Sequence, residues 1–342
     1  MPAIGLFILT ACATGGRPVS DEIDAIMRSY EGAVPGASLV VIGNGVPLVR
    51  RSWGFSDVEA RVAATPETNY RLASVTKQFT AAAVLLLLQD GKLSLNDSAS
   101  KWLPSLPKAA GAVTLRQLLT HTSGIIDYEG VVPAGTTTQL LDADVLRLIA
   151  PHDSTYFRPG TSYRYSNSAY ALLALVVEHA SGKSFATFLR ERIFLPLGMN
   201  ASVAYEEGVS GISQRAFGYT KNGEAWTRKD QSLTSAVLGD GGIYSSVDDL
   251  AKWDAALYDS RLLNDESRRV AFAPQVQTDE ADVRYGFGWR ITGETLWHSG
   301  ETSGFRNVIV RYPARRLTVV ILTNRDDPSP YATALEISKL FL

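Results

Sequence analysis

The sequence lacks several features on which whole classes of proteins depend. Its 342 residues include a single cysteine, Cys12, so no disulfide can form within the chain. The formal net charge is −2 and the basic residues form no block, which argues against nucleic acid as a partner. No run of about 18 apolar residues occurs, so we expect no transmembrane helix. The length suits one large domain or two small ones.

Common catalytic and phosphate-binding motifs are also missing. The sequence has no Gly-x-Ser-x-Gly, as in α/β-hydrolases, and no His-Glu-x-x-His, as in zinc proteases. Gly182-Lys183-Ser184 has the form of the end of a phosphate-binding loop, but Val177 stands where such a loop needs its earlier glycine. We therefore expect no metal site and no cofactor.

The first residues have the character of an export signal. Residues 1–11 are apolar and uncharged, and Leu9-Thr10-Ala11-Cys12 is followed by small residues. This pattern resembles the lipobox of a bacterial lipoprotein, in which Cys12 is lipidated and anchors the chain to the membrane. We expect residues 1–17 to be a signal segment and the protein to be exported, as a periplasmic protein or membrane-anchored lipoprotein. The alternative is a disordered terminus with an incidental cysteine, because the apolar stretch 1–11 is short and lacks the Lys or Arg of a normal n-region.

We expect residues 18–342 to form one domain with strands from both ends of the chain. Residues 37–42 and 46–53 are rich in β-forming residues and flank Gly43-Asn44-Gly45, a strong hairpin signal. The pattern from about residue 93 to residue 247 is mostly helical, with Gly, Pro and Ser punctuation. We therefore predict an α/β (α+β) fold, an antiparallel sheet flanked by helices and built from both termini, with an inserted all-helical lobe and a cleft between the two.

The individual elements follow from local periodicity and capping signals. Helices are expected over 21–31, 115–119, 142–149, 169–180, 184–193, 246–258 and 332–342. Late strands are expected over 286–292, 294–298, 307–312 and 317–323.

The stretch Ser74-Val75-Thr76-Lys77 runs directly into a long apolar segment without Gly or Pro. This segment predicts a buried helix with Ser74 in its first turn. Lys77 lies three residues on, so its amine shares a helical face with the Ser74 hydroxyl, as an activated nucleophile requires. Taken alone, the pattern also fits a helix cap with a solvated lysine. Two other Ser-x-x-Lys sequences, which end at Lys101 and Lys108, lie in polar or Pro-interrupted stretches where no buried helix is expected.

Two more motifs follow in chain order, Tyr165-Ser166-Asn167 and His298-Ser299-Gly300. Singly, each has an ordinary structural interpretation, as a core tyrosine, a turn residue or a strand histidine. Together with Ser74-x-x-Lys77 they resemble the penicillin-recognising serine hydrolases, and within these the class C β-lactamase-like family of DD-peptidases, D-aminopeptidases and serine esterases. The resemblance runs from about residue 37 to the last residue and implies a β-lactamase/transpeptidase-like fold. Other stretches that resemble family landmarks are Leu118–Gly124, Pro196–Met199 and Gly241–Ser246.

The functional groups of these residues suggest their chemistry. A neutral serine needs a base. Lys77 serves if its pKa falls through burial and nearby positive charge, and Tyr165 serves as a phenolate or proton relay if cations lower its pKa from about 10. The two would share one proton network, so the identity of the base stays open. Asn167 offers a donor and an acceptor, with which it can orient Lys77 and bind a substrate amide.

The stretch from His298 to Glu301 is expected to form the opposite side of the site, with His298 positioning the substrate. The backbone N–H of Ser74 is one expected oxyanion donor, and the resemblance implies that the N–H of Glu301, directly after Ser299 and Gly300, is the second. Many β-lactamases and transpeptidases carry lysine at the position of His298. A histidine there is mostly neutral at pH 7, so the site should depend less on an anionic substrate.

We therefore predict a serine hydrolase that forms an acyl-enzyme with an ester or amide of a small molecule or peptide. The resemblance favours an esterase, D-aminopeptidase or DD-carboxypeptidase, with weak β-lactamase activity compatible with each. The alternative is a non-catalytic, penicillin-binding-like sensor or binding protein on the same fold. A third hypothesis, a structural surface lipoprotein, rests on Cys12 alone.

Overall fold

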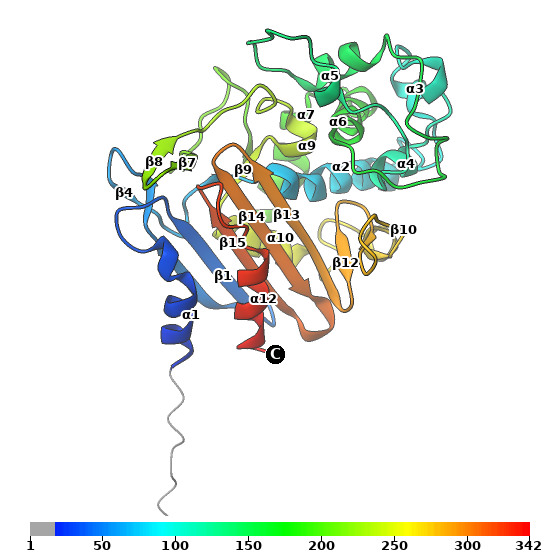
Figure 1. Cartoon of the computed structure of the whole chain (residues 1–342). Coiled ribbons are helices and arrows are strands. Elements are labelled where there is room, and N and C mark those ends of the chain that lie inside the picture. Colours follow the sequence, from blue (N-terminus) through cyan, green and yellow to red (C-terminus); the bar gives the residue numbers. More distant parts are fainter. Residues whose placement is uncertain (1–17) are drawn as a thin grey trace, which may run out of the picture.

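The computed structural model describes residues 18–342, and an eight-stranded antiparallel sheet forms its centre (Figure 1). The strand order is β10-β11-β12-β13-β14-β15-β1-β2. The strands are β1 (Ala37–Gly43), β2 (Val46–Trp53), β10 (Val276–Gln277), β11 (Arg284–Tyr285), β12 (Arg290–Thr292), β13 (Thr295–Thr302), β14 (Phe305–Tyr312) and β15 (Leu317–Thr323). The strand β1 lies between β2 and β15, with Ala37 opposite both Trp53 and Thr323. The expected sheet built from both ends of the chain is confirmed.

Helices cover both faces of this sheet because its central strands are apolar on both sides. On β15, Val319 and Ile321 belong to one buried cluster, while Val320 and Leu322 belong to the other. The first face packs against α1 (Val19–Met27) and α12 (Tyr331–Lys339), which lie side by side in Figure 1. The second face packs against α10 (Val247–Ala256) and supports α2 (Lys77–Gln89), whose residues from Lys77 to Leu87 are all buried.

Most of the segment from 93 to 247 forms a helical lobe at the top of Figure 1, while its residues 219–228 (β7 and β8) lie at the left, next to β4 (Val62–Ala63). Its helices are α3 (Ala99–Trp102), α4 (Leu115–Leu119), α5 (Asp142–Ile149), α6 (Asn167–Ser181), α7 (Phe185–Leu189), α8 (Leu195–Leu197) and α9 (Leu238–Gly241). The segment also carries four short strands, which the expectation of an all-helical lobe did not include: β6 (Val203–Ala204), β7 (Tyr219–Asn222), β8 (Ala225–Arg228) and β9 (Ile243–Ser245). The strand β9 pairs with β5 (Tyr70–Arg71) and so ties the lobe to the chain before Ser74.

Most predicted elements occur near their expected positions, and one strand is shorter. The hairpin of β1 and β2, α4, α5 and β15 match closely, and the remaining elements are α11 (Asp265–Phe272), β3 (Phe55–Asp57) and β4 (Val62–Ala63). The strand expected over 286–292 begins only at Arg290. Gly286 and Gly288 instead lie against other backbone: a Cβ on Gly288 would stand 2.7 Å from the carbonyl oxygen of Lys77. That close packing replaces strand pairing there.

The predicted signal segment and Cys12 lie outside the described residues, so export and lipidation stay predictions from the sequence. Among residues 18–342, no helix has both the length and the apolarity that crossing a membrane requires.

Candidate active site

Ser74 lies on a tight turn directly before a buried helix. The turn is the 3₁₀ helix η2 (Ala73–Thr76), and α2 follows without a break. Ala73 has a φ of +50°, in the left-handed region that costs a residue with a side chain about 1–2 kcal/mol. This strained residue turns the chain so that Ser74 projects into the space between the sheet and the lobe. Ser74 and Lys77 lie on the same face of this turn, as the spacing predicts, and Lys77 Nζ lies 3.0 Å from Ser74 Oγ.

Lys77 is fully buried and has three hydrogen-bond partners. Its Nζ lies 3.0 Å from Ser74 Oγ, 2.9 Å from Asn167 Oδ1 and 2.9 Å from the backbone oxygen of Asp240. The last two atoms can only accept hydrogen bonds, whereas a hydroxyl can donate or accept. An ammonium can therefore donate to all three, and a neutral amine can donate to two and accept the Ser74 proton. The same geometry accommodates both protonation states that a proton-transfer group must visit.

Asn167 is the first residue of α6, where the lobe contacts α2. The side chain of Ser166 caps this helix by accepting a hydrogen bond from the N–H of Ala169, which fixes the backbone at Asn167. The amide of Asn167 then bridges two groups, because its Oδ1 accepts from Lys77 and its Nδ2 donates to Glu129 Oε1 at 3.0 Å. Asn167 thereby links the buried amine to an exposed carboxylate.

Tyr165 lies near Lys77 with its aromatic ring rather than with its hydroxyl. Lys77 Nζ lies 4.9 Å from the centroid of the Tyr165 ring, which itself packs on His121 at 4.3 Å between centroids. The hydroxyl is buried and has no hydrogen-bond partner within residues 18–342. Proton transfer through Tyr165 therefore needs a side-chain movement or a bound group that contacts its hydroxyl.

Asp240 belongs to the site through its backbone and was not predicted. Its carbonyl oxygen accepts from Lys77, and its carboxyl group accepts from the Tyr128 hydroxyl at 3.2 Å. Burial raises the pKa of the Asp240 carboxyl to about 8 although Lys77 opposes this shift, so the group is largely protonated at pH 7. The helix α9 is held in place by Asp142, whose carboxylate accepts the backbone N–H groups of Leu238 and Gly239.

The strand β13 passes close to the turn that carries Ser74. A Cβ on Gly300 would stand 2.0 Å from the oxygen of Leu72 and 3.2 Å from the nitrogen of Ser74. Only glycine allows this approach. Ser299, Gly300 and Glu301 follow one another along β13, and Glu301 lines the same cleft as Ser74.

His298 is placed differently from Glu301. Its side chain is 2% exposed and does not line the cleft. Its Nδ1 lies 2.6 Å from the oxygen of Ser299, to which it must donate, so Nε2 accepts from the Tyr285 hydroxyl at 3.1 Å. Burial, with Arg290 nearby, lowers the pKa of His298 to about 3. The imidazole is therefore neutral at pH 7, as expected from the sequence.

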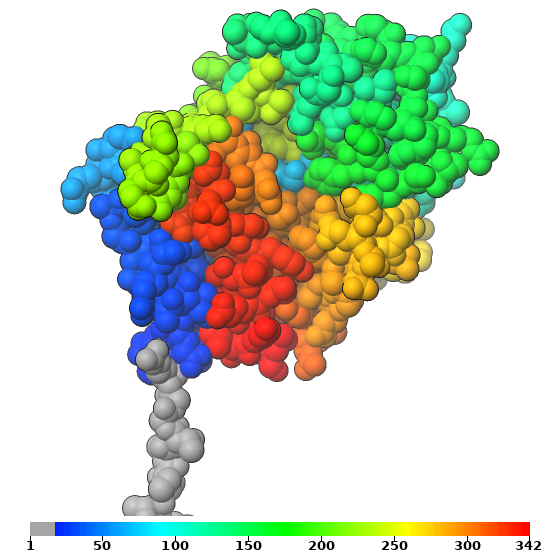
Figure 2. All heavy atoms as spheres, in the orientation of Figure 1, coloured from blue at the N-terminus to red at the C-terminus, as the bar shows by residue number. Residues whose placement is uncertain are grey.

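The cleft measures about 360 Å³ including the space at its mouth. Figure 2 shows the molecular surface indented between the lobe and the strands around β13, with light-blue atoms of the segment that holds η2 and α2 at the base. Most of its lining is polar. The lining residues are Arg71, Ala73, Ser74, Glu129, Asn167, Thr234, Ser235, Asp240, Gly241, Glu301 and Thr302.

The described part of the chain contains no group of three or more His, Cys, Asp or Glu side chains arranged to hold a metal ion. The site has a nucleophile candidate in Ser74, a proton-transfer group in Lys77 that contacts it, and the strand β13, which approaches Ser74 closely at Gly300. This arrangement suits acyl transfer by a serine.

Comparisons with known proteins agree with this chemistry. A family model described as Beta-lactamase matches residues 19–340. Penicillin-binding protein 4* of Bacillus subtilis is 32% identical over 307 residues, which cover 84% of this chain and 68% of that protein. A D-aminopeptidase of Gluconobacter oxydans is 30% identical over 338 residues, which cover 92% of this chain but only 62% of the longer relative.

A solved structure with the same fold is the octameric penicillin-binding protein homologue from Pyrococcus abyssi. It superimposes with a TM-score of 0.82 at 28% identity, and the match covers 94% of this chain and 76% of the homologue.

Proposed function

Because the chain belongs to the β-lactamase family and is a serine hydrolase of that family, we propose that it hydrolyses small amides and peptides whose acyl group carries a free amine, as in D-aminoacyl substrates. The observation that carries this proposal is the carboxylate of Glu129. It is exposed in the cleft and accepts a hydrogen bond from Asn167, which also contacts Lys77. Within residues 18–342 it forms no ion pair, so it is free to bind an ammonium group.

In the first half of the reaction Ser74 acts as the nucleophile. Its Oγ forms a bond to the substrate carbonyl carbon, and its proton passes to the Lys77/Tyr165 pair. The carbonyl oxygen becomes an anion and accepts hydrogen bonds from the backbone N–H groups of Ser74 and Glu301. The bond to the leaving amine then breaks, and the same pair returns the proton to that amine.

In the second half water takes the place of the amine. The Lys77/Tyr165 pair accepts a proton from water as its oxygen attacks the acyl carbon, the ester bond to Ser74 breaks, and Ser74 regains its proton. Asn167 keeps Lys77 directed at Ser74 throughout. The products are a free acid and an amine.

The neutral state of His298 weighs against penicillins and C-terminal D-alanyl peptides as preferred substrates. Both classes carry a carboxylate beyond the scissile bond, and a permanent cation on β13 would favour it. Here the imidazole is buried and neutral, and it accepts a hydrogen bond from the Tyr285 hydroxyl. Esterase activity, with an alcohol as the leaving group, uses the same machinery and is the second candidate. A non-catalytic sensor would not need an amine positioned on Ser74.

The experiment compares D-alanine p-nitroanilide with its N-acetyl derivative, which lacks the positive charge. We expect the free amine to have a kcat/KM about 10- to 100-fold higher, and Glu129→Gln to abolish most of that difference. The control is Glu207→Gln, which removes an exposed carboxylate outside the cleft. Acid quench and mass spectrometry should detect an acyl adduct on the Ser74 peptide. Equal turnover of both substrates, or release of p-nitroaniline by Ser74→Ala, would contradict the proposal.

A further inference from the structure

Arg71 is a buried cation in the wall of the cleft, three residues before Ser74. It lies on β5, is 2% exposed and lines the cleft. Its guanidinium donates to three neutral acceptors: the backbone oxygen of Ser235 at 2.6 Å, Gln231 Oε1 at 2.8 Å and the Tyr244 hydroxyl at 3.0 Å. No carboxylate within residues 18–342 forms an ion pair with it. Buried charges without a counter-charge are rare because their desolvation is costly.

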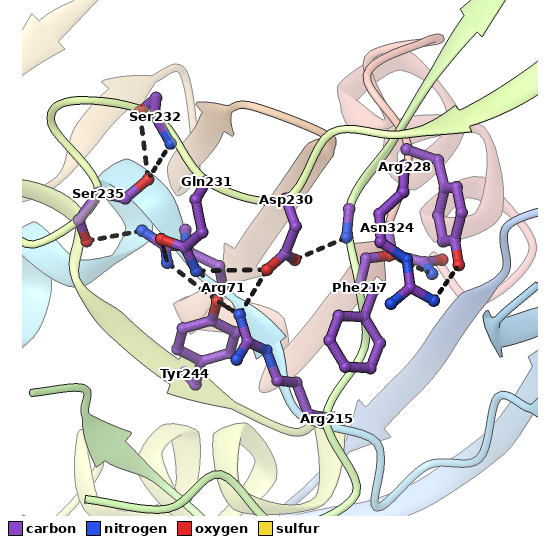
Figure 3. Close-up of polar contacts among 12 residues, drawn as sticks. Arg71, Arg215, Phe217, Arg228, Asp230, Gln231, Ser232, Ser235, Tyr244 and Asn324 are labelled. Atoms are coloured by element: carbon purple, nitrogen blue, oxygen red, sulfur yellow. Dashed lines mark hydrogen bonds and ion pairs between the residues drawn. The ribbon is translucent and has the colours of Figure 1, made fainter. Parts of the chain in front are cut away.

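Arg215, in the same cluster, provides the contrast. Figure 3 shows both guanidinium groups close to Tyr244, with Asp230 beside Arg215. Arg215 pairs with Asp230, whereas Arg71 meets the amide oxygen of Gln231. The cluster thus neutralises the cation that does not line the cleft and leaves unpaired the one that does.

Arg71 also retains a hydrogen-bond donor. Its Nη1 carries two hydrogens, and Ser235 is the one acceptor recorded for that atom in the described chain. The second hydrogen has no acceptor within residues 18–342. Around it the cleft is lined by the hydroxyl residues Thr234, Ser235 and Thr302, with Ala73 and Gly241 as the small apolar surfaces. This lining suits a short polar side chain rather than a large apolar one.

The part of the substrate that meets Arg71 follows from the position of the proton donor. A leaving amine must lie beside the group that protonates it. Tyr165 does not line this cleft but a second, open pocket, together with Tyr156 and Tyr163. Because Tyr165 belongs to the proton-transfer pair, we place the leaving group on the Tyr165 side of Ser74 and the acyl side chain in the cleft beside Arg71.

Arg71 is the basic residue that lines the cleft, and the other ionisable lining residues are acidic. Glu129 is assigned to the substrate amine, and Glu301 lies 3.7 Å from Arg306. Asp240 is largely protonated at pH 7. An acyl group with one amine and one carboxylate would match Glu129 and Arg71 together.

Resting on the function proposed above, we propose that Arg71 binds a carboxylate on the acyl side chain, so that the preferred acyl groups are acidic amino acids such as D-aspartyl and D-glutamyl. The bond is a charge-assisted hydrogen bond from Nη1 to the carboxylate. Arg71 is thus a specificity-determining residue that contacts substrate.

The test uses matched p-nitroanilides of D-Glu and D-Gln, and of D-Asp and D-Asn, with the full chain. We expect kcat/KM to be about 10- to 100-fold higher for each acid than for its amide, chiefly through KM. Arg71→Gln should bring the ratio close to one, and Arg71→Lys should retain part of it. Arg215→Gln is the control: it removes the other guanidinium of the cluster and should leave the ratio unchanged.

A purely structural role for Arg71 would lower activity on all four substrates together and leave the ratios intact, which would overturn the inference. If Arg71→Gln fails to fold, the wild-type ratios decide, and acid-to-amide ratios at or below one overturn it. Turnover of D-Gln and D-Ala without preference for the acids would reject this inference alone. No turnover of any amine-bearing substrate would instead reject the proposed function.

Discussion

Two sets of polar residues at the site differ in how they are satisfied. Among the motif residues, Lys77 has three hydrogen-bond partners and His298 has two, and both side chains are buried. Glu129 and Arg71, by contrast, line the cleft and form no ion pair within residues 18–342. A satisfied group is held in one geometry, whereas a charge without a counter-charge is available to an oppositely charged group of a ligand. The comparison separates the residues of the chemical step from those that we propose select the substrate.

The largest effect should come from removing the amine of Lys77, the motif residue that contacts Ser74. Lys77→Ala should lower kcat/KM by about 10³-fold on every substrate, because Ser74 loses its proton acceptor. Lys101→Ala is the matched control. It lies in another Ser-x-x-Lys sequence, but its side chain is 54% exposed and pairs with Asp97. Steady-state kinetics with D-alanine p-nitroanilide measures both. A Lys77 variant within tenfold of wild type would show that the amine is not the proton acceptor.

The second test changes the approach of β13 to Ser74. In Gly300→Ala the new Cβ would overlap the oxygen of Leu72, so the strand must move away from the nucleophile. We expect kcat to fall by about 10²-fold, the effect of losing one oxyanion donor, with KM little changed. Gly211→Ala, which has no atom within 4 Å of its new Cβ, should have no effect. Unchanged kcat in Gly300→Ala would mean that β13 contributes nothing to the oxyanion site.

The smallest expected effect concerns His298 and stability. Its pKa is lowered in the folded state, so the folded protein binds a proton on His298 less readily than the unfolded chain does. Above the ordinary value near 6.5 the ring is neutral in both states, and the stability that depends on a neutral His298 is fully present. As the pH falls from about 6.5 toward 3, the free energy of unfolding should decrease by up to about 1.4 kcal/mol per pH unit from this group. Urea unfolding at several pH values measures the slope. His298→Gln should flatten it, whereas His152→Gln, an exposed residue, should not. Equal slopes in all three proteins would contradict burial of a neutral His298.

Much of the fold could be predicted from the sequence because its signals are local. Gly43-Asn44-Gly45 specifies the first hairpin, and Thr114 and Gln117 form a capping box that begins α4 where expected. The strand expected over 286–292 was wrong in its first half. Its glycines pack against the backbone of α2 and α11, contacts that a local pattern does not contain.

The candidate site divides in the same manner. Ser74, Lys77 and Asn167 were found because a motif names them, and the structure brings their side chains together. Asp240 was missed because it acts through a backbone oxygen, which no side-chain pattern reports, although it precedes the recognised stretch at Gly241. Glu129 and Arg71 were missed because their significance lies in having no counter-charge within residues 18–342, and this becomes visible only when distant segments are placed in space.

The position of β1 between β2 and β15 has a consequence for synthesis on the ribosome. Ala37 needs Thr323 as its partner, and Ser74 needs β13, so the sheet and the cleft stay incomplete until residue 323 has been translated. Until then the apolar strand β1 has an open edge, which favours pairing with other chains. Such a high contact order predicts slow folding. The nascent protein is therefore without hydrolytic activity, and it depends on protection from aggregation until its last strands emerge.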